Sequence, residues 1–297
     1  MMTVKKLSRE ELLLPGHAAC PGCGAMIALR TMLKTLGRRT ILVIPACCTS
    51  VIQALVPKTS IGVPVLNIAF AASGAAASGV VEALEKLRRK DINVVVWAGD
   101  GGTADIGIQA LSGAAERKNN IIYICYDNEA YMNTGIQRSG ATPYGAWTTT
   151  TPIKGKTEFK KDMPMIMAAH GIPYVATASA GFPLDFANKL LKASKLKGLK
   201  YIHLLAPCPT GWRYDSKLTV RLGRLAVWTW MWPLFEVEHG VFKLTLKPKP
   251  RPVKEFLEPQ GRFRRMTPEE IELLQKWVDQ RRELLLKMDG ARLFPQA

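Results

Sequence analysis

The feature that most constrains this chain is a Val-rich run, residues 92–98, that leads directly into Gly99-Asp100-Gly101-Gly102. Continuous apolar runs of this length are typical of strands buried on both faces of a parallel sheet. An Ala-rich segment with apolar residues at helical spacing follows over 104–117, and a second β-rich run follows over 120–126. A strand, a helix and a strand in this order predict a βαβ crossover, which joins parallel strands.

Further segments continue the same alternation. The pattern predicts helices over 25–36 and 183–192 and strands over 40–44, 173–176 and 199–205. We therefore expect an α/β fold with a doubly wound, mostly parallel sheet that occupies residues 1–210. A chain of 297 residues is long enough to bury such a core.

Residues 211–297 have a different composition and form the predicted C-terminal extension. They contain a Trp-rich segment at 228–232, a Pro/Lys stretch at 246–254 and a charged helix. Thr267, with Glu270 three residues later, predicts the N-cap of that helix. We interpret the extension as an extended tail that contacts partner subunits; a partly disordered tail is the alternative.

The net charge of +17 does not by itself indicate nucleic acid. Residues 41–150 carry eight basic and eight acidic side chains, so the excess lies towards the two ends. No basic groove or nucleic-acid-binding module is apparent, and dispersed charge suits acidic protein partners equally well. Apolar runs fall short of the ~18 residues that a membrane span needs, and the first residues lack a signal-peptide pattern. We expect a cytoplasmic protein without nucleic-acid or membrane partners.

The glycine-rich turn after residue 98 suits a phosphorylated ligand. Glycines let the backbone approach a ligand closely, and a following helix offers free amides to phosphate. Asp100, however, would repel a bare diphosphate. A divalent cation removes this conflict, because Mg²⁺ commonly joins protein oxygens to phosphate oxygens. Asp100 is therefore the predicted metal ligand.

The other half of such a site is expected at the end of the next strand, because ligands gather at the carboxyl ends of parallel strands. Asn128 lies there, 28 residues after Asp100. Its side-chain oxygen and the Ala130 carbonyl are candidates for the remaining protein ligands. A Gly-Asp-Gly turn and an Asn at this spacing resemble the thiamine-diphosphate motif.

Six cysteines occur, at positions 20, 23, 47, 48, 125 and 208. Thiols in a cytoplasmic chain stay reduced, so their spacing suggests metal ligation before disulfides. Cys20 and Cys23 form a C-x-x-C pair in a Gly/Pro turn. Cys208 and one of the neighbours Cys47 and Cys48 are positioned after strands, where they could join that pair.

Four thiolates suit zinc or a 4Fe–4S cluster. One close pair with two distant single cysteines favours the cluster, because zinc ribbons normally use two close pairs. The pattern alone leaves the choice between Cys47 and Cys48 open. Cys125 lies within an apolar strand and is interpreted as a small buried hydrophobe.

Together these motifs resemble the β subunits of 2-oxoacid:ferredoxin oxidoreductases, above all pyruvate:ferredoxin oxidoreductase (pyruvate synthase). The resemblance covers about residues 15–215 and rests on residues 17–24, the Pro-Ala-Cys-Cys turn, and residues 97–107, 126–137 and 142–147. The relative that acts on 2-oxoisovalerate shares much of the pattern.

The resemblance implies a thiamine-diphosphate-binding fold, with thiamine diphosphate, Mg²⁺ and a 4Fe–4S cluster as cofactors. It assigns Cys20, Cys23, Cys48 and Cys208 to the cluster and Asp100, Asn128 and Ala130 to Mg²⁺. It also assigns Gly99, Gly101, Asn133 and Thr134 to the cofactor, with Asn133 as the catalytic residue.

The implied reaction is oxidative decarboxylation of pyruvate with coenzyme A to acetyl-CoA and CO₂, with electrons passing through the cluster to ferredoxin. Partner subunits of α, γ and δ type are implied, so the isolated β subunit should be inactive. A branched-chain 2-oxoacid enzyme and a non-catalytic, metal-stabilised binding subunit are the alternatives. A nucleotide-dependent dehydrogenase fits poorly, because Ala104 replaces the last glycine of its motif and an acid lies within the loop.

Overall fold

Eight strands form one sheet in the computed structural model, which describes residues 3, 5, 7–54 and 59–295. Their order across the sheet is β2-β1-β3-β4-β6-β5-β7-β8. The strands are β1 (Thr40–Pro45), β2 (Val65–Ile68), β3 (Asn93–Gly99), β4 (Ile121–Asp127), β5 (Tyr174–Ser179), β6 (Lys200–Leu205), β7 (Phe235–Glu238) and β8 (Val241–Leu244). The first six are parallel, and β7 and β8 add an antiparallel edge.

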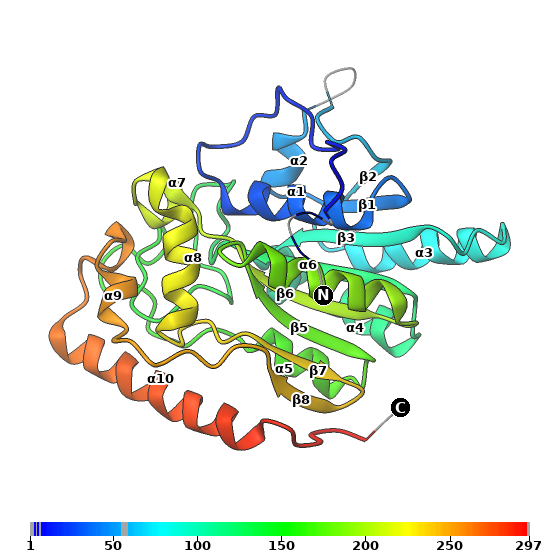
Figure 1. The fold of residues 1–297 in the computed structure, drawn as a ribbon. Coiled ribbons are helices and arrows are strands. Elements are labelled where there is room, and N and C mark those ends of the chain that lie inside the picture. The colour runs from blue at the N-terminus through cyan, green and yellow to red at the C-terminus, as the bar shows by residue number, and fades with distance from the viewer. Residues whose placement is uncertain (1–2, 4, 6, 55–58, 296–297) are drawn as a thin grey trace.

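Helices cover both faces of the sheet (Figure 1). The helices α1 (Gly24–Leu36) and α6 (Pro183–Lys195) lie on one face, and α3 (Ser73–Lys86), α4 (Ile108–Glu116) and α5 (Met163–Ala169) lie on the other. In β3, Val95 and Trp97 point to the first face, whereas Val94 and Val96 point to the second. A strand buried on both faces needs the continuous apolar run seen in the sequence. The predicted doubly wound, mostly parallel fold is confirmed.

The strand order reverses between β1 and β3. The chain passes from β1 outward to β2 and then returns to β3 on the other side of β1. The loops that leave β1 and β3 at their carboxyl ends therefore diverge and leave a crevice between them. This topology places residues 46–48 and 99–102 on either side of one opening.

The sequence predictions missed the region between β1 and β3. The helices α2 (Cys48–Ile52) and α3 and the edge strand β2 were not predicted. β2 has four residues, none of them fully buried, so it lacks the apolar run that marks the central strands. The helix α3 begins with small residues, and its periodicity is correspondingly weak.

The predicted helix after β3 begins earlier than expected. The backbone becomes helical at Asp100, immediately after the strand, and forms a π-helical turn over Gly102–Ile106 before α4. Such wide turns are rare and frequently occur at functional sites. A side chain at Gly107 would clash with the Gly102 carbonyl, at 2.0 Å from a Cβ, so this wide turn requires glycine there.

The C-terminal segment folds onto the sheet and does not form an extended tail. It adds β7 and β8 and the helices α8 (Thr219–Trp228), α9 (Lys254–Leu257) and α10 (Pro268–Met288). Figure 1 shows α10 running along the outer side of the molecule below α8 and β8. Thr267 and Glu270 form the predicted capping box of α10. The predicted boundary after residue 210 falls within the short helix α7 (Pro209–Trp212), and contact with partner subunits stays a prediction.

Within the described ranges, no helix has the length and apolar character required to cross a membrane.

Candidate cofactor site

A cavity of about 460 Å³ opens at the carboxyl ends of β1, β3 and β4. Its wall contains all seven residues predicted to contact the cofactor or its metal: Gly99, Asp100, Gly101, Asn128, Ala130, Asn133 and Thr134. Cys47 and Cys48 line it from the β1 side, and Phe70 and Tyr131 add aromatic surface. Three segments that are distant in sequence thus meet at the crevice that the strand order creates.

The three predicted metal ligands converge on one point of this cavity. One atom of the Asn128 side-chain amide lies 2.9 Å from Asp100 Oδ1 and 3.0 Å from the Ala130 carbonyl oxygen. If this atom is the nitrogen, it donates to both oxygens. If it is the oxygen, three oxygens face one another, which is the ligand type that Mg²⁺ requires. The donor set therefore fits a divalent cation, and the amide can rotate to suit its presence.

Asp100 also fits a metal ligand by its electrostatics. The residue is buried, and its Oδ2 accepts a hydrogen bond of 2.6 Å from Ser139 Oγ. Burial, followed by the charge of Asp127, raises the pKa of Asp100. In the part of the chain that the structure describes, no basic side chain forms an ion pair with it. A bound cation would supply the missing compensation for this carboxylate.

Asp127 is the contrasting acid of the same region. It is buried and pairs with Lys160 Nζ and His203 Nε2, both at 2.9 Å. Burial alone would raise the pKa of Asp127, but Lys160 and His203 outweigh burial and lower it to about 2. The charge of Asp127 is thus balanced by its ion-pair partners. Asp100, in contrast, faces the cavity without such a partner among the described residues. The sequence predictions did not include Lys160, His203 or Ser139.

The site glycines matter for close approach and not for unusual backbone angles. Gly101 has a helical φ of −62°, and a Cβ there would lie 2.3 Å from the Tyr131 ring. Gly99 has ordinary space around it, with its nearest neighbour Tyr126 at 3.6 Å from such a Cβ. The bare backbone of Gly101 is therefore needed for packing against Tyr131.

Asn133 and Thr134 lie on the exposed rim of the cavity. Thr134 Oγ1 donates to Gln137 Oε1 at 2.7 Å, which fixes the rim loop on itself. The catalytic role assigned to Asn133 and the cofactor contact assigned to Thr134 stay predictions.

The C-x-x-C turn is held against the chain that carries Cys208. Gly24 N donates to the Pro207 carbonyl at 3.1 Å, and Thr219 Oγ1 donates to the Gly22 carbonyl at 2.6 Å. Gly22 has a φ of +72°, and a Cβ there would meet the Ser216 carbonyl at 2.6 Å. The glycine and these hydrogen bonds bring the turn and Cys208 together.

The thiols influence one another electrostatically. Burial raises the pKa of Cys208 to about 11, the Gly211 amide opposes this effect, and the nearby Cys23 and Cys20 add to it. Burial likewise raises the pKa of Cys48, with further contributions from Cys208, Cys47 and Cys23. Crowded buried thiols lose their protons readily only when a metal cation or a cluster binds to the sulfur atoms in place of the protons.

Cys47 and Cys48 differ in their surroundings. Cys48 interacts with Cys208 and Cys23, whereas the Cys47 thiol bonds to the Tyr126 hydroxyl. This arrangement favours Cys48 over Cys47 as the fourth cysteine of the set that contains Cys20, Cys23 and Cys208. Among the described residues, no three His, Cys, Asp or Glu side chains are placed to share one metal ion. A 4Fe–4S cluster spreads its thiolates around four irons, and its ligand set stays a prediction. Cys125 is fully buried in β4, as the sequence indicated.

Comparisons with known proteins agree with this geometry. Residues 47–204 match the thiamine pyrophosphate enzyme family, C-terminal TPP binding domain. Pyruvate synthase subunit PorB of Methanothermobacter thermautotrophicus is 55% identical over 280 residues, which cover 92% of this chain and 97% of PorB. The chain belongs to the family of 2-oxoacid:ferredoxin oxidoreductase β subunits.

Another relative of this β subunit carries a different substrate in its name. Ketoisovalerate oxidoreductase subunit VorB of Pyrococcus abyssi is 53% identical over 292 residues, which cover 94% of each chain. A solved 2-oxoglutarate:ferredoxin oxidoreductase from Magnetococcus marinus aligns with a TM-score of 0.57 over 75% of this chain and 80% of the other. At 24% identity, that structure supports the fold.

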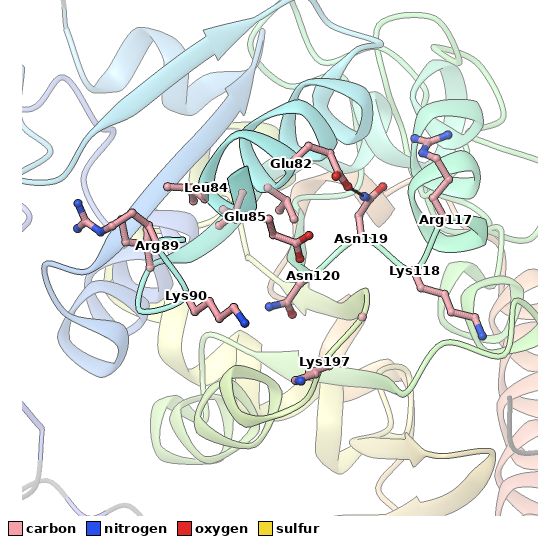
Figure 2. A pocket seen from close by; sticks show the side chains of 14 residues that line it. Glu82, Leu84, Glu85, Arg89, Lys90, Arg117, Lys118, Asn119, Asn120 and Lys197 are labelled. Atoms are coloured by element: carbon pink, nitrogen blue, oxygen red, sulfur yellow. Dashed lines mark hydrogen bonds between the residues drawn. The ribbon is translucent and has the colours of Figure 1, made fainter. Parts of the chain in front are cut away.

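A second cavity lies at the opposite end of the sheet in this β subunit. It has about 410 Å³ and is formed by the loops that enter β3, β4 and β6. Figure 2 shows exposed charged side chains around it, among them Arg89, Lys90, Lys118 and Lys197, with Glu85 on the same wall. It contains none of the predicted site residues.

Proposed function

We propose that this β subunit belongs to a pyruvate:ferredoxin oxidoreductase and binds thiamine diphosphate through Mg²⁺. The observation that carries the proposal is the convergence of Asp100, Asn128 and the Ala130 carbonyl in one cavity. In this proposal the complex converts pyruvate and coenzyme A to acetyl-CoA and CO₂. The electrons leave through a 4Fe–4S cluster to ferredoxin.

In the proposed site, Asp100, Asn128 and the Ala130 carbonyl hold the metal, and Gly99 and Gly101 allow the chain to approach the diphosphate. Thiamine diphosphate, when bound, supplies the electron sink for decarboxylation of a 2-oxoacid.

The proposed cluster ligands are Cys20, Cys23, Cys48 and Cys208. Their position supports electron transfer, because Cys48 lies near enough to Asp100 for the charge of that residue to raise the thiol pKa further. Cys48 thus lines the same cavity as the proposed metal ligands, from the β1 side of the opening. Electrons from the substrate would have a short path to the cluster.

The proposed enzyme acts as a complex in the cytoplasm. The subunit names of its relatives support further subunits, which we propose to be of α, γ and δ type. In this proposal, the acidic residue that activates the cofactor comes from the α-type partner subunit. The purified β subunit alone should therefore be inactive.

A branched-chain substrate is the second candidate. It is favoured by the 53% identity to a ketoisovalerate oxidoreductase subunit, nearly equal to that for the pyruvate synthase subunit.

Anaerobic purification of the complex, followed by cofactor and metal analysis, tests the proposal. We expect thiamine diphosphate, magnesium, iron and sulfide in the complex, and coenzyme-A-dependent reduction of a dye acceptor by pyruvate. A higher kcat/KM for 2-oxoisovalerate than for pyruvate would select the second candidate. A complex that binds no thiamine diphosphate would contradict both.

A further inference from the structure

The loop that provides two of the proposed metal ligands has an unfavourable backbone conformation. Glu129 lies between Asn128 and Ala130 and has a φ of +66°. Residues other than glycine rarely adopt this left-handed region, because their Cβ crowds the backbone. The conformation nevertheless lets the Asn128 side chain and the Ala130 carbonyl face the same point. Other parts of the protein must therefore hold Glu129 in place.

The Glu129 side chain is buried and paired at both oxygens. Oε1 lies 3.0 Å from Lys160 Nζ, and Oε2 lies 2.6 Å from Arg262 Nη2. Lys160 is shared with Asp127, at 2.9 Å. Arg262, in contrast, has Glu129 as its one ion-pair partner within the described chain. The Arg262 contact is thus the one dedicated to this loop.

Arg262 also supports the loop by a second route. Its guanidinium carbon lies 3.8 Å from the centroid of the Trp212 ring. Trp212 Nε1 in turn donates to the Asn128 carbonyl at 2.8 Å. Arg262 Nε donates to Gln260 Oε1 at 2.9 Å, and the arginine is only 2% exposed. A planar, buried guanidinium held on several sides has little freedom to move.

We propose that Arg262 is a positioning residue for the metal site, acting through Glu129 and Trp212 on the loop that carries Asn128 and Ala130. Arg262 belongs to the short helix Gly261–Phe263 in the C-terminal segment. That segment therefore contributes to cofactor binding without touching the cofactor. The inference rests on the proposed function, because it requires a cation at this loop.

Mn²⁺ binding to the assembled complex tests this inference without relying on activity. The complex is freed of metal, thiamine diphosphate is added, and free Mn²⁺ is followed by electron paramagnetic resonance. Arg262→Gln should raise the Kd for Mn²⁺ at least tenfold. Arg264→Gln removes an equal charge from an exposed neighbour and should change the Kd less than twofold.

A rescue variant separates positioning from a general structural role. Glycine adopts a left-handed conformation freely. Adding Glu129→Gly to Arg262→Gln should therefore return the Kd to within about threefold of the wild type. Because glycine also relieves strain at this position, thermal unfolding of the same variants is measured, and the changes in Kd should not follow the melting temperature. Absence of rescue overturns the inference.

Asp100→Ala in the same assay distinguishes failure of the proposed metal site from failure of the proposed role of Arg262. If Asp100→Ala loses Mn²⁺ and Arg262→Gln binds like Arg264→Gln, the proposed function stands and the role of Arg262 is refuted. If Asp100→Ala binds Mn²⁺ like the wild type, the metal site itself is wrong and the inference falls with it.

Discussion

The two ends of the sheet carry cavities of similar size and opposite chemistry. The cavity at the carboxyl end has about 460 Å³, and the one at the amino end has about 410 Å³. At the carboxyl end, Asp100 is buried without a basic partner and meets an amide and a carbonyl. At the amino end, charged side chains extend into solvent from exposed loops (Figure 2).

The two cavities differ in the state of their charges and not in their volume, and the buried acid lies at the end where we propose the cofactor site. Exposed lysines and glutamates are solvated and need no ligand. A buried carboxyl group is costly to ionise unless something compensates its charge, which suits the cation that we propose beside Asp100. Mutations at each end should therefore have different consequences.

The largest effect is expected from Asp100→Ala. Loss of a charged metal ligand should weaken binding of thiamine diphosphate with Mg²⁺ by more than about 100-fold, beyond what outer-shell changes cause. Isothermal titration of the metal-depleted complex measures this. Glu85→Ala, which removes an exposed carboxylate from the other cavity, is the matched control and should bind normally. The metal-free Asp100→Ala complex should melt no lower than the wild type, because a buried charge has been removed.

Cys48→Ser should have the next largest effect. Serine is a poor ligand for iron, so the complex should lose most of its cluster iron and the associated visible absorption. Cys47→Ser is the matched control, since that thiol bonds to Tyr126. Iron assays of both variants decide the comparison. Equal iron in the two variants would remove Cys48 from the ligand set.

Ser139→Ala should have a moderate effect on the same site. It removes the 2.6 Å hydrogen bond to Asp100 Oδ2 but leaves the ligands in place. Outer-shell partners of metal ligands are worth about 10- to 100-fold in affinity, and we expect about tenfold weaker Mg²⁺ binding for this neutral donor. Magnesium titration of thiamine diphosphate binding measures it. Unchanged affinity would mean that Ser139 only fills space beside Asp100.

The sequence was sufficient to predict the central sheet and the proximity of the candidate site residues near its strands. The interiors of strands β3 and β4 are largely apolar, and the polar residues at and after their carboxyl ends stand out by contrast. Because parallel strands end at the same edge, the sequence predicts that Asp100 and Asn128 lie close together.

The supporting residues could not be found in this way. Ser139 lies in a loop and Arg262 in a single short helical turn, neither with a periodic sequence pattern, 39 and 162 positions after Asp100. The contacts of Arg262 depend on how the C-terminal segment folds back over the sheet, and that of Ser139 depends on the path of the long loop between β4 and α5. The sequence does not predict the left-handed backbone conformation of Glu129 either, because glutamate is not a residue that indicates such a conformation.

The smallest effect is expected at the amino end, from Lys200. This lysine is buried, and its Nζ donates at 2.6 Å to Oδ1 of Asn120, a residue that lines the cavity at the amino end. Burial lowers the pKa of Lys200 to about 7. Between this value and the ordinary lysine pKa, the unfolded chain binds more protons than the folded one, so the free energy of unfolding rises with pH.

Lys200→Met lacks this proton uptake. The stability of this variant relative to the wild type should therefore be most favourable below pH 7 and should decline by at least about 1 kcal/mol by pH 10. The full pKa shift of Lys200, at ~1.4 kcal/mol per pKa unit, would give a larger decline, but water in the neighbouring cavity reduces the effect. Urea unfolding of the purified chain at pH 6 and pH 10 measures the change. Lys197→Met removes an exposed lysine from the same cavity and should show no such dependence. A constant difference for Lys200→Met would mean that the ammonium is solvated, and the amino end would then contain no buried charge that depends on pH.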